Sequence, residues 1–113
     1  MAVAFVQGLQ GRDDNYLQAV ATVKHFVANN SEFNRHSGSS DIEERFLREY
    51  YLPSFKAALI EGQAQSVMSA YNSVNGVPAS VNKWLLDSVL RQEWGFEVDN
   101  QSNVKTVAYV ERA

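Results

Sequence analysis

A short apolar run that ends in two basic side chains most constrains how this chain can fold. The run is Val20-Ala21-Thr22-Val23, and Lys24-His25 follows it at once. Consecutive apolar residues without alternation are typical of a strand buried on both faces. Because lysine is almost never fully buried without a partner, two interpretations are open. Either Lys24 extends to the rim while His25 packs in the core, or the strand delivers both side chains into a pocket at its carboxyl end, where α/β folds place their sites.

Strands and helices alternate along the chain, and this alternation predicts a parallel sheet. Helical spacing of apolar residues covers 2–10, 41–62 and 81–94, and strands are expected at 19–25 and 65–71. Helices between consecutive strands imply parallel pairing and right-handed crossovers. The chain is therefore predicted to be an α/β protein whose strand ends meet at one edge of a sheet.

The helix expected at 41–62 carries the strongest local signals. Ser40 and Glu43 have the spacing of a capping box, and Pro53 is expected to kink or restart the helix because it lacks a backbone donor. Apolar side chains predicted to face inward form a stripe: Ile42, Phe46, Leu47, Tyr50 and Tyr51. Two pairs of opposite charge four residues apart are expected on the exposed face: Asp41 with Arg45, and Glu44 with Arg48.

Length and composition exclude several classes of function. The 113 residues suit at most one domain, with 45% hydrophobic and 20% charged residues as in folded globular chains. A net charge of −3 without a basic block argues against a nucleic-acid partner. The absence of cysteine excludes a disulfide scaffold and a thiolate metal site. No apolar run approaches the ~18 residues of a membrane span, and residues 1–11 lack the basic region and cleavage site of a signal peptide.

Four segments in a fixed order carry a resemblance to a known family. They are Lys24-His25-Phe26-Val27-Ala28-Asn29-Asn30 with Glu32 and Arg35; Glu44-Arg45 with Leu47-Arg48-Glu49 and Tyr51-Leu52-Pro53; Val67-Met68-Ser69-Ala70-Tyr71-Asn72 with Val74-Asn75-Gly76; and Trp84-Leu85-Leu86 with Val89-Leu90-Arg91 and Glu93-Trp94-Gly95-Phe96. In order and spacing they resemble family 3 glycoside hydrolases of the β-glucosidase and β-xylosidase type. The resemblance covers residues 1–97, and four ordered motifs are far more specific than any one alone.

This resemblance implies a fold and a set of sugar-binding residues. The family's catalytic domain is a (β/α)8 TIM barrel that binds sugar at the carboxyl ends of its strands, so this chain would be a partial barrel with parallel strands and crossover helices. The match implies that Lys24, His25, Arg35 and Tyr71 line the subsite left of the scissile bond. Their chemistry suits a sugar, because Lys and Arg donate hydrogen bonds, His does either, and Tyr joins a hydroxyl to an apolar face.

Structural interpretations stand beside these roles: a rim lysine, a core histidine, a loop ion pair for Arg35 and a packed Tyr71. His36 is predicted to be a solvated loop residue, and Glu32 to hold its loop through an Asn or Arg neighbour. Trp84 and Trp94 are expected to pack. The spacing of His25, Glu32 and His36 matches no known metal-ligand pattern, so neither a metal nor a cofactor is expected.

The catalytic pattern fails after Phe96. The family's route needs two carboxyl groups, and its nucleophile is the Asp of a Ser-Asp pair that ends an apolar strand. Aligned without gaps, Ser102 matches that Ser and Asn103 matches the Asp, but an amide cannot act as the nucleophile. Asp99 reaches the position only with a gap, and the acid/base region is missing, so no catalytic residue is assigned.

The domain prediction follows from this failure. Residues 1–97 are predicted to be a fragment of a family 3 barrel, since a complete barrel needs about 200–250 residues. Residues 98–113 are predicted to be a divergent tail, non-homologous to the family, as a truncated or frame-shifted reading would produce. Alternating residues over 104–110 favour a half-exposed strand there.

Three hypotheses for function remain open. The first is a fragment of a glycoside hydrolase that cleaves terminal β-linked glucose or xylose in carbohydrate catabolism, inactive by itself. The second is a non-catalytic sugar-binding or interaction module derived from that domain, and the third is a structural half-barrel that assembles with a complementary chain. The expected partners are a β-linked oligosaccharide or glycoside and the remaining barrel segments or a second copy, but neither nucleic acid nor membrane. The family resemblance suggests a secreted or periplasmic protein, but with no signal peptide expected the compartment stays unassigned.

Overall fold

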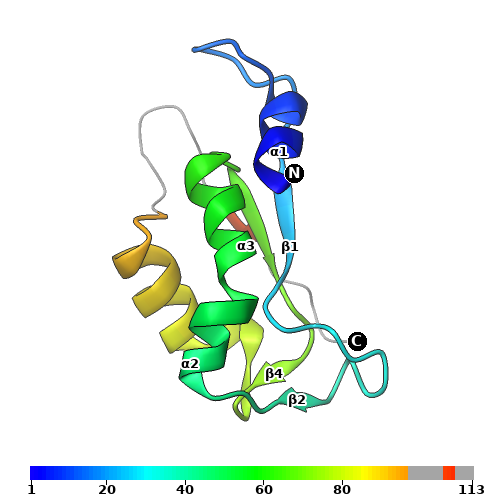
Figure 1. The fold of residues 1–113 in the computed structure, drawn as a ribbon. Helices are drawn as coiled ribbons and strands as arrows, with labels where there is room; N and C mark the ends of the chain where they lie inside the picture. Colours follow the sequence, from blue (N-terminus) through cyan, green and yellow to red (C-terminus); the bar gives the residue numbers. More distant parts are fainter. Residues whose placement is uncertain (97–105, 109–113) are drawn as a thin grey trace.

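The structure, a computed structural model, describes residues 1–96 and 106–108, and its elements follow the predicted order (Figure 1). Labels with η mark π-helical segments and, for η3, a 3-10 turn. The bounds are α1 (Ala2–Gln10), β1 (Thr22–Phe26), β2 (Ser39–Ser40), α2 (Glu44–Phe46), η1 (Leu47–Tyr51), α3 (Pro53–Lys56), η2 (Ala57–Glu61), β3 (Ser66–Ser69), β4 (Ser73–Val74), β5 (Val77–Pro78), η3 (Ala79–Val81), η4 (Trp84–Glu93) and β6 (Thr106–Ala108).

Strands β1, β3 and β6 form one parallel sheet in the order β1-β3-β6. Thr22 pairs with Ser66 and Phe26 with Ser69, and the register shifts between Val23 and Phe26. The strands expected at 19–25 and 65–71 are thus confirmed as parallel neighbours. Figure 1 shows the helical run from α2 to η2 alongside this pair, as a connection between parallel strands requires.

One short strand represents the tail. Thr106 of β6 lies beside Ser66 and Ala108 beside Met68, so a strand near 104–110 is confirmed over these residues. Asp99, Ser102 and Asn103, on which the prediction about the nucleophile depends, lie outside the described residues.

The core lies between the sheet and the two long helical runs. Its largest fully buried apolar side chains come from the strands, the helices and the adjoining loops: Phe26, Val27, Leu47, Leu59, Val67, Val74, Leu85, Val89, Leu90 and Phe96. The Phe26 ring, at the end of β1, contacts both helical runs: its centre lies 5.2 Å from that of Phe55 in α3 and 6.0 Å from that of Trp94 at the end of η4. Leu85, Val89 and Leu90 all lie on η4 and are fully buried in this core.

The predicted capping box is wrong. The helix begins at Glu44, and its N-cap, Glu43, makes no side-chain capping bond. Ser40 instead belongs to β2, where its hydroxyl donates to the Ala28 carbonyl at 2.9 Å. A tertiary partner has therefore replaced the local one. The restart at Pro53 is confirmed, since α3 begins at that residue.

One predicted charge pair on this helix is confirmed and the other is wrong. Arg48 donates to Glu44 at 2.7 Å, whereas Arg45 pairs with Glu49 at 3.0 Å. Asp41 lies before the first helical residue, so it does not share a helix face with Arg45.

The apolar stripe of the helix is only partly inward. Leu47 is fully buried, but Phe46 is 55% and Tyr50 is 76% exposed, because none of the described residues covers that side of the helix. The prediction that both face the core is therefore wrong.

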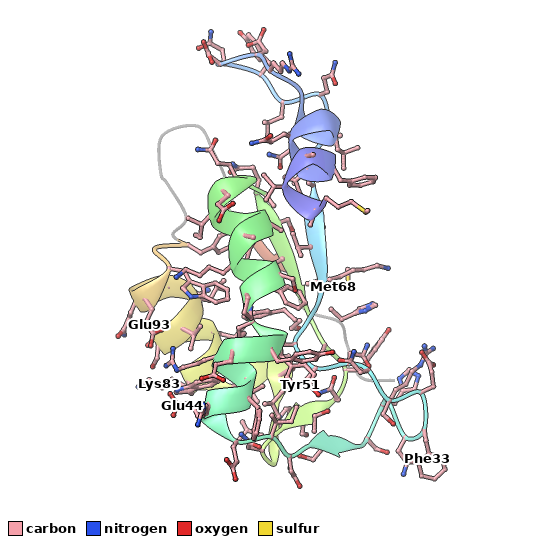
Figure 2. All side chains as sticks on the ribbon, viewed as in Figure 1. Phe33, Glu44, Tyr51, Met68, Lys83 and Glu93 are labelled. Carbon is pink, nitrogen blue, oxygen red and sulfur yellow. The ribbon has the colours of Figure 1, made fainter. Side chains whose placement is uncertain are left out.

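Arg48 also clamps the two long helices together. Its two terminal nitrogens donate to Glu93 at 2.7 and 2.9 Å, and its guanidinium lies 5.4 Å from the Trp84 ring centre. Glu44 and Glu93 flank this contact from neighbouring helices (Figure 2). Hydrogen bonds from Arg48 hold the pKa of Glu93 below its usual value.

The amino end of the sheet is closed by one buried amide. Gln10, 5% exposed, accepts hydrogen bonds through Oε1 from the backbone N–H groups of Ala21 and Gln65, each at 3.2 Å, and donates to the Gln63 carbonyl at 2.9 Å. It thus joins α1 to the starts of β1 and β3. None of the described helices combines the length and apolar character needed to cross a membrane.

Candidate sugar-binding edge

Lys24 and His25 lie at the carboxyl end of β1 and share a hollow of about 390 Å³. Lys24 is exposed and His25 is half-buried. The hollow is also lined by the chain that follows β1 and by one face of the neighbouring helix: Ala28, Asn29, Asn30, Tyr50, Tyr51, Ser54 and Phe55. Of the two interpretations, a core position for His25 is wrong, whereas Lys24 is at the rim.

The electrostatic environment of His25 favours the neutral imidazole. Desolvation lowers its pKa from the usual 6.5, and the positive charges of Lys24 and Arg35 lower it further. Arg35, ten residues further along the chain, acts on His25 through its charge. A neutral imidazole next to two cations can donate through one nitrogen and accept through the other.

Arg35 is held within its loop by two side chains. Its Nη1 donates to Glu32 Oε2 and its Nε to His36 Nε2, at 3.4 and 3.3 Å. The prediction that Glu32 ties its loop to an Arg or Asn neighbour is confirmed. Phe33, from the same loop, is 83% exposed and lies at the outer end of the loop (Figure 2).

Tyr71, two residues beyond β3, meets the loop through an aromatic contact. Its ring centre lies 4.7 Å from that of His36, with the planes inclined by 54°. The solvated His36 predicted from the sequence is thus exposed but not isolated. Sequence reasoning missed this contact, and the signal available was only that His36 directly follows Arg35.

Hydrogen bonds between the loop and the 72–78 hairpin set the path of the loop. In β2 and β4, which pair in parallel, the N–H of Ser73 donates to the Gly38 carbonyl at 2.9 Å. The buried Asn72 amide donates to Val27 O and Ser40 Oγ, both at 3.3 Å. Asn75 adds reciprocal bonds to the backbone of Ile42, of 2.7 and 2.9 Å.

The four predicted residues therefore form two subsets at one sheet edge. Lys24 and His25 line the hollow, and Arg35 and Tyr71 do not line it but meet through His36. The positive charge of Arg35, which contributes to lowering the pKa of His25, links the two subsets. Among the described residues, no three His, Cys, Asp or Glu side chains gather as a metal site.

A larger hollow, of about 690 Å³, lies away from this edge. It runs between the two long helices and is lined by residues that include Arg48, Lys56, Ile60 and Glu93. Two of its charged groups, Arg48 and Glu93, pair across the helices, and neither Lys24 nor Tyr71 lines it. We therefore take the smaller hollow, and not the larger, as part of the candidate site.

Comparison with known proteins gives one family. The family model "Glycosyl hydrolase family 3 N terminal domain" matches residues 1–108. A β-glucosidase of Rhizobium radiobacter is 50% identical over 96 residues, which are 85% of this chain and 11% of that protein. A β-xylosidase of Formosa agariphila is 47% identical over 105 residues, covering 86% of this chain and 14% of the relative.

A solved structure with similar fold is β-glucosidase 3B from Thermotoga neapolitana in complex with glucose. It has a TM-score of 0.72 and 47% sequence identity over 80% of this chain and 12% of that one. The chain thus spans between about a tenth and a seventh of the length of these relatives. The predicted α/β partial barrel is confirmed by this likeness together with the parallel sheet.

Proposed function

The chain belongs to glycosyl hydrolase family 3, and from this membership we propose that it forms part of the sugar-binding face of a glycosidase for terminal β-linked glucose or xylose. The observation that carries the proposal is the gathering of Lys24, His25, Arg35 and Tyr71 at the carboxyl edge of one parallel sheet. Ligands of barrel enzymes bind at this edge.

The donors at this edge suit a ring of hydroxyl groups. Lys24 supplies a mobile ammonium donor, and Arg35 supplies a planar fork that matches two vicinal hydroxyls. His25, whose pKa is lowered by desolvation and by its cationic neighbours, complements them with an acceptor in its neutral form. Tyr71 adds an aromatic face against which the apolar face of a pyranose can pack.

The proposal for catalysis is narrower than the one for binding. Retaining and inverting glycosidases both use a pair of carboxyl groups. Glu32 is ion-paired to Arg35, and Asn103 occupies the gapless position of the nucleophile. We infer that the isolated chain has no turnover, and that residues 98–113 diverge from the family in the nucleophile motif although the match reaches residue 108.

The proposed macromolecular partner is the rest of a family 3 barrel. Among the described residues, strand β1 lies at an edge of its sheet, where a further strand could pair with it. Phe46 and Tyr50 are exposed on the neighbouring helix and would be covered by the same partner. Without it, a second copy is the expected substitute, and the chain is expected to be marginally stable or to associate.

A segment exchange tests the proposal. Residues 1–96 replace the matching segment of the R. radiobacter β-glucosidase, and hydrolysis of an aryl β-glucoside is measured. The chimera is expected to be active, and Lys24→Met or Arg35→Met within it to lower kcat/KM about 10- to 100-fold, the effect of removing one charged donor. Lys83→Met is the control for loss of a lysine elsewhere.

An inactive but folded chimera would refute the enzymatic proposal. If the 113-residue chain nevertheless bound methyl β-D-glucoside, the non-catalytic sugar-binding module would replace it. The encoding DNA gives a second test of the tail. Another reading frame after Phe96 that encodes an apolar strand ending in Ser-Asp would support the glycosidase fragment.

A further inference from the structure

We propose that His36 is a positioning residue that fixes Arg35 and Tyr71 relative to each other at the carboxyl edge of the sheet. The inference rests on the proposed function, in which Arg35 and Tyr71 contact the sugar. His36 is the side chain that joins them, since it accepts from Arg35 Nε at 3.3 Å and packs on the Tyr71 ring at 4.7 Å.

Two hydrogen bonds engage two of the three nitrogens of the Arg35 guanidinium. Nε donates to His36 and Nη1 to Glu32, whereas Nη2 has no hydrogen-bond partner among the described residues. Side chains of the loop therefore hold the guanidinium in place through these two nitrogens. The Nη2 donors remain for a ligand, and a guanidinium held in this way loses less conformational freedom when it binds.

The ring contact performs the corresponding task for Tyr71. Arg35 lies on the loop and Tyr71 follows β3, so no local sequence relation fixes the distance between them. A tilted contact between aromatic rings restricts the side-chain torsions of both. Because Arg35 and Tyr71 contact the same imidazole, the position of that side chain sets the position of one relative to the other.

Backbone hydrogen bonds hold the chain around His36 in a turn. The Asn34 carbonyl accepts from the N–H groups of Ser37 and Gly38 at 2.9 and 2.6 Å, which closes a tight turn across His36. A Cβ at Gly38 would lie 2.9 Å from that same carbonyl oxygen, so glycine is required for the turn. From Ser39 onward the chain is paired to β4.

Two substitutions separate the two contacts in the 113-residue chain. His36→Gln keeps an acceptor for Arg35 but removes the ring, and His36→Phe keeps a ring for Tyr71 but removes the acceptor. His36→Ala removes both. Phe33→Ala is the matched control, because it removes an exposed aromatic side chain from the same loop.

The first measurement needs no ligand. NMR spectra report the solvent exchange of the Arg35 Nε–H and the ring shifts of Tyr71. We expect His36→Gln to move only the Tyr71 signals, His36→Phe to accelerate only the Arg35 exchange, His36→Ala to do both, and Phe33→Ala to do neither. Unchanged signals of both residues in His36→Ala would overturn the proposal.

The second measurement titrates methyl β-D-glucopyranoside into the same proteins. We expect His36→Ala to weaken binding roughly three- to tenfold, the effect of one hydrogen bond on an equilibrium constant, with His36→Gln and His36→Phe in between. Equal affinities of wild type and His36→Ala would overturn the positioning role. If the wild type itself does not bind, the proposed function fails for the isolated chain, whereas the ligand-free signals still decide whether His36 joins Arg35 to Tyr71.

Discussion

The polar side chains at the two ends of the parallel sheet differ in burial and in hydrogen bonding. At the amino end, Gln10 is buried, and its side chain makes three hydrogen bonds to backbone groups. They are the N–H groups of Ala21 and Gln65, directly before β1 and β3, and the carbonyl of Gln63. At the carboxyl end, the exposed Lys24 and the half-buried His25 line an open hollow, and Tyr71 nearby is also half-buried.

The difference shows where stability and binding separate in this fold. A buried amide with satisfied partners stabilises the sheet, because any change leaves backbone groups unpaired. Desolvation, and after it the positive charges of Lys24 and Arg35, lower the pKa of His25, so this edge disfavours a further positive charge. Polar groups at this end are therefore better explained by a ligand than by packing.

The largest effect should come from the aromatic residue that joins the carboxyl end to the helices. Phe26→Ala removes a fully buried ring that contacts Phe55 and Trp94, and should lower the free energy of unfolding by about 3–5 kcal/mol. Urea unfolding followed by circular dichroism measures it. Phe33→Ala, an exposed ring, should change stability by less than about 0.5 kcal/mol. Equal losses in the two variants would contradict the assignment of the core.

A slightly smaller loss is expected at the amino end. Gln10→Leu leaves two backbone N–H groups without their acceptor and removes one of the two donors to the Gln63 carbonyl, and should destabilise the chain by about 2–4 kcal/mol. Gln7→Leu is the matched control, since Gln7 lies on the same helix and makes only one exposed bond, to Glu61 O at 3.4 Å. The comparison between the ends breaks if both substitutions have the same effect in urea unfolding.

The exposed Arg48–Glu93 pair between the helices should contribute less to the free energy of unfolding. Arg48→Met removes the paired bonds to Glu93, and the expected loss at neutral pH is about 1 kcal/mol, near the upper limit for surface pairs. Because the folded-state pKa of Glu93 is lowered, the contribution is present above the pKa of the unfolded chain and is lost as pH falls through the folded pKa. Thermal unfolding of both proteins at pH 7 and about pH 3 tests this, and a difference that persists in acid would exclude the ion pair as its cause.

The smallest effect on stability should come from the carboxyl end. Lys24→Met is expected to change the free energy of unfolding by less than about 0.5 kcal/mol, and to raise the pKa of His25 toward its usual value by removing one of its cationic neighbours. In the wild type, the unfolded chain takes up the His25 proton first, so stability falls as pH falls from the unfolded pKa to the folded one. NMR titration of His25 measures the shift, with Lys83→Met as the control. An unchanged His25 pKa in Lys24→Met would mean that the two side chains do not interact.

Local patterns in the sequence determined the elements and their order. The apolar runs before Lys24 and before Tyr71 indicated strands, and Pro53 indicated where a helix restarts; the structure has each. Burial on both faces is confirmed for β3 but is wrong for β1, in which Thr22 and Lys24 are exposed. The order of strands and helices implied parallel pairing, which places both strand ends at one edge. These inferences succeed because the periodicity of a strand or a helix is local and can be recognised from residues a few positions apart in the sequence.

Only the tertiary structure decided which polar groups meet. Ser40 fits a helix cap by local spacing, yet its hydroxyl donates to the Ala28 carbonyl, because pairing of β2 with β4 brings it there. His36 carries no signal of its own, and its contact with Tyr71 joins residues separated by a helix and a strand. The sequence thus predicted which side chains could bind a sugar, whereas the distance between Arg35 and Tyr71 depends on how a loop returns to the sheet, and that path is set by long-range backbone hydrogen bonds.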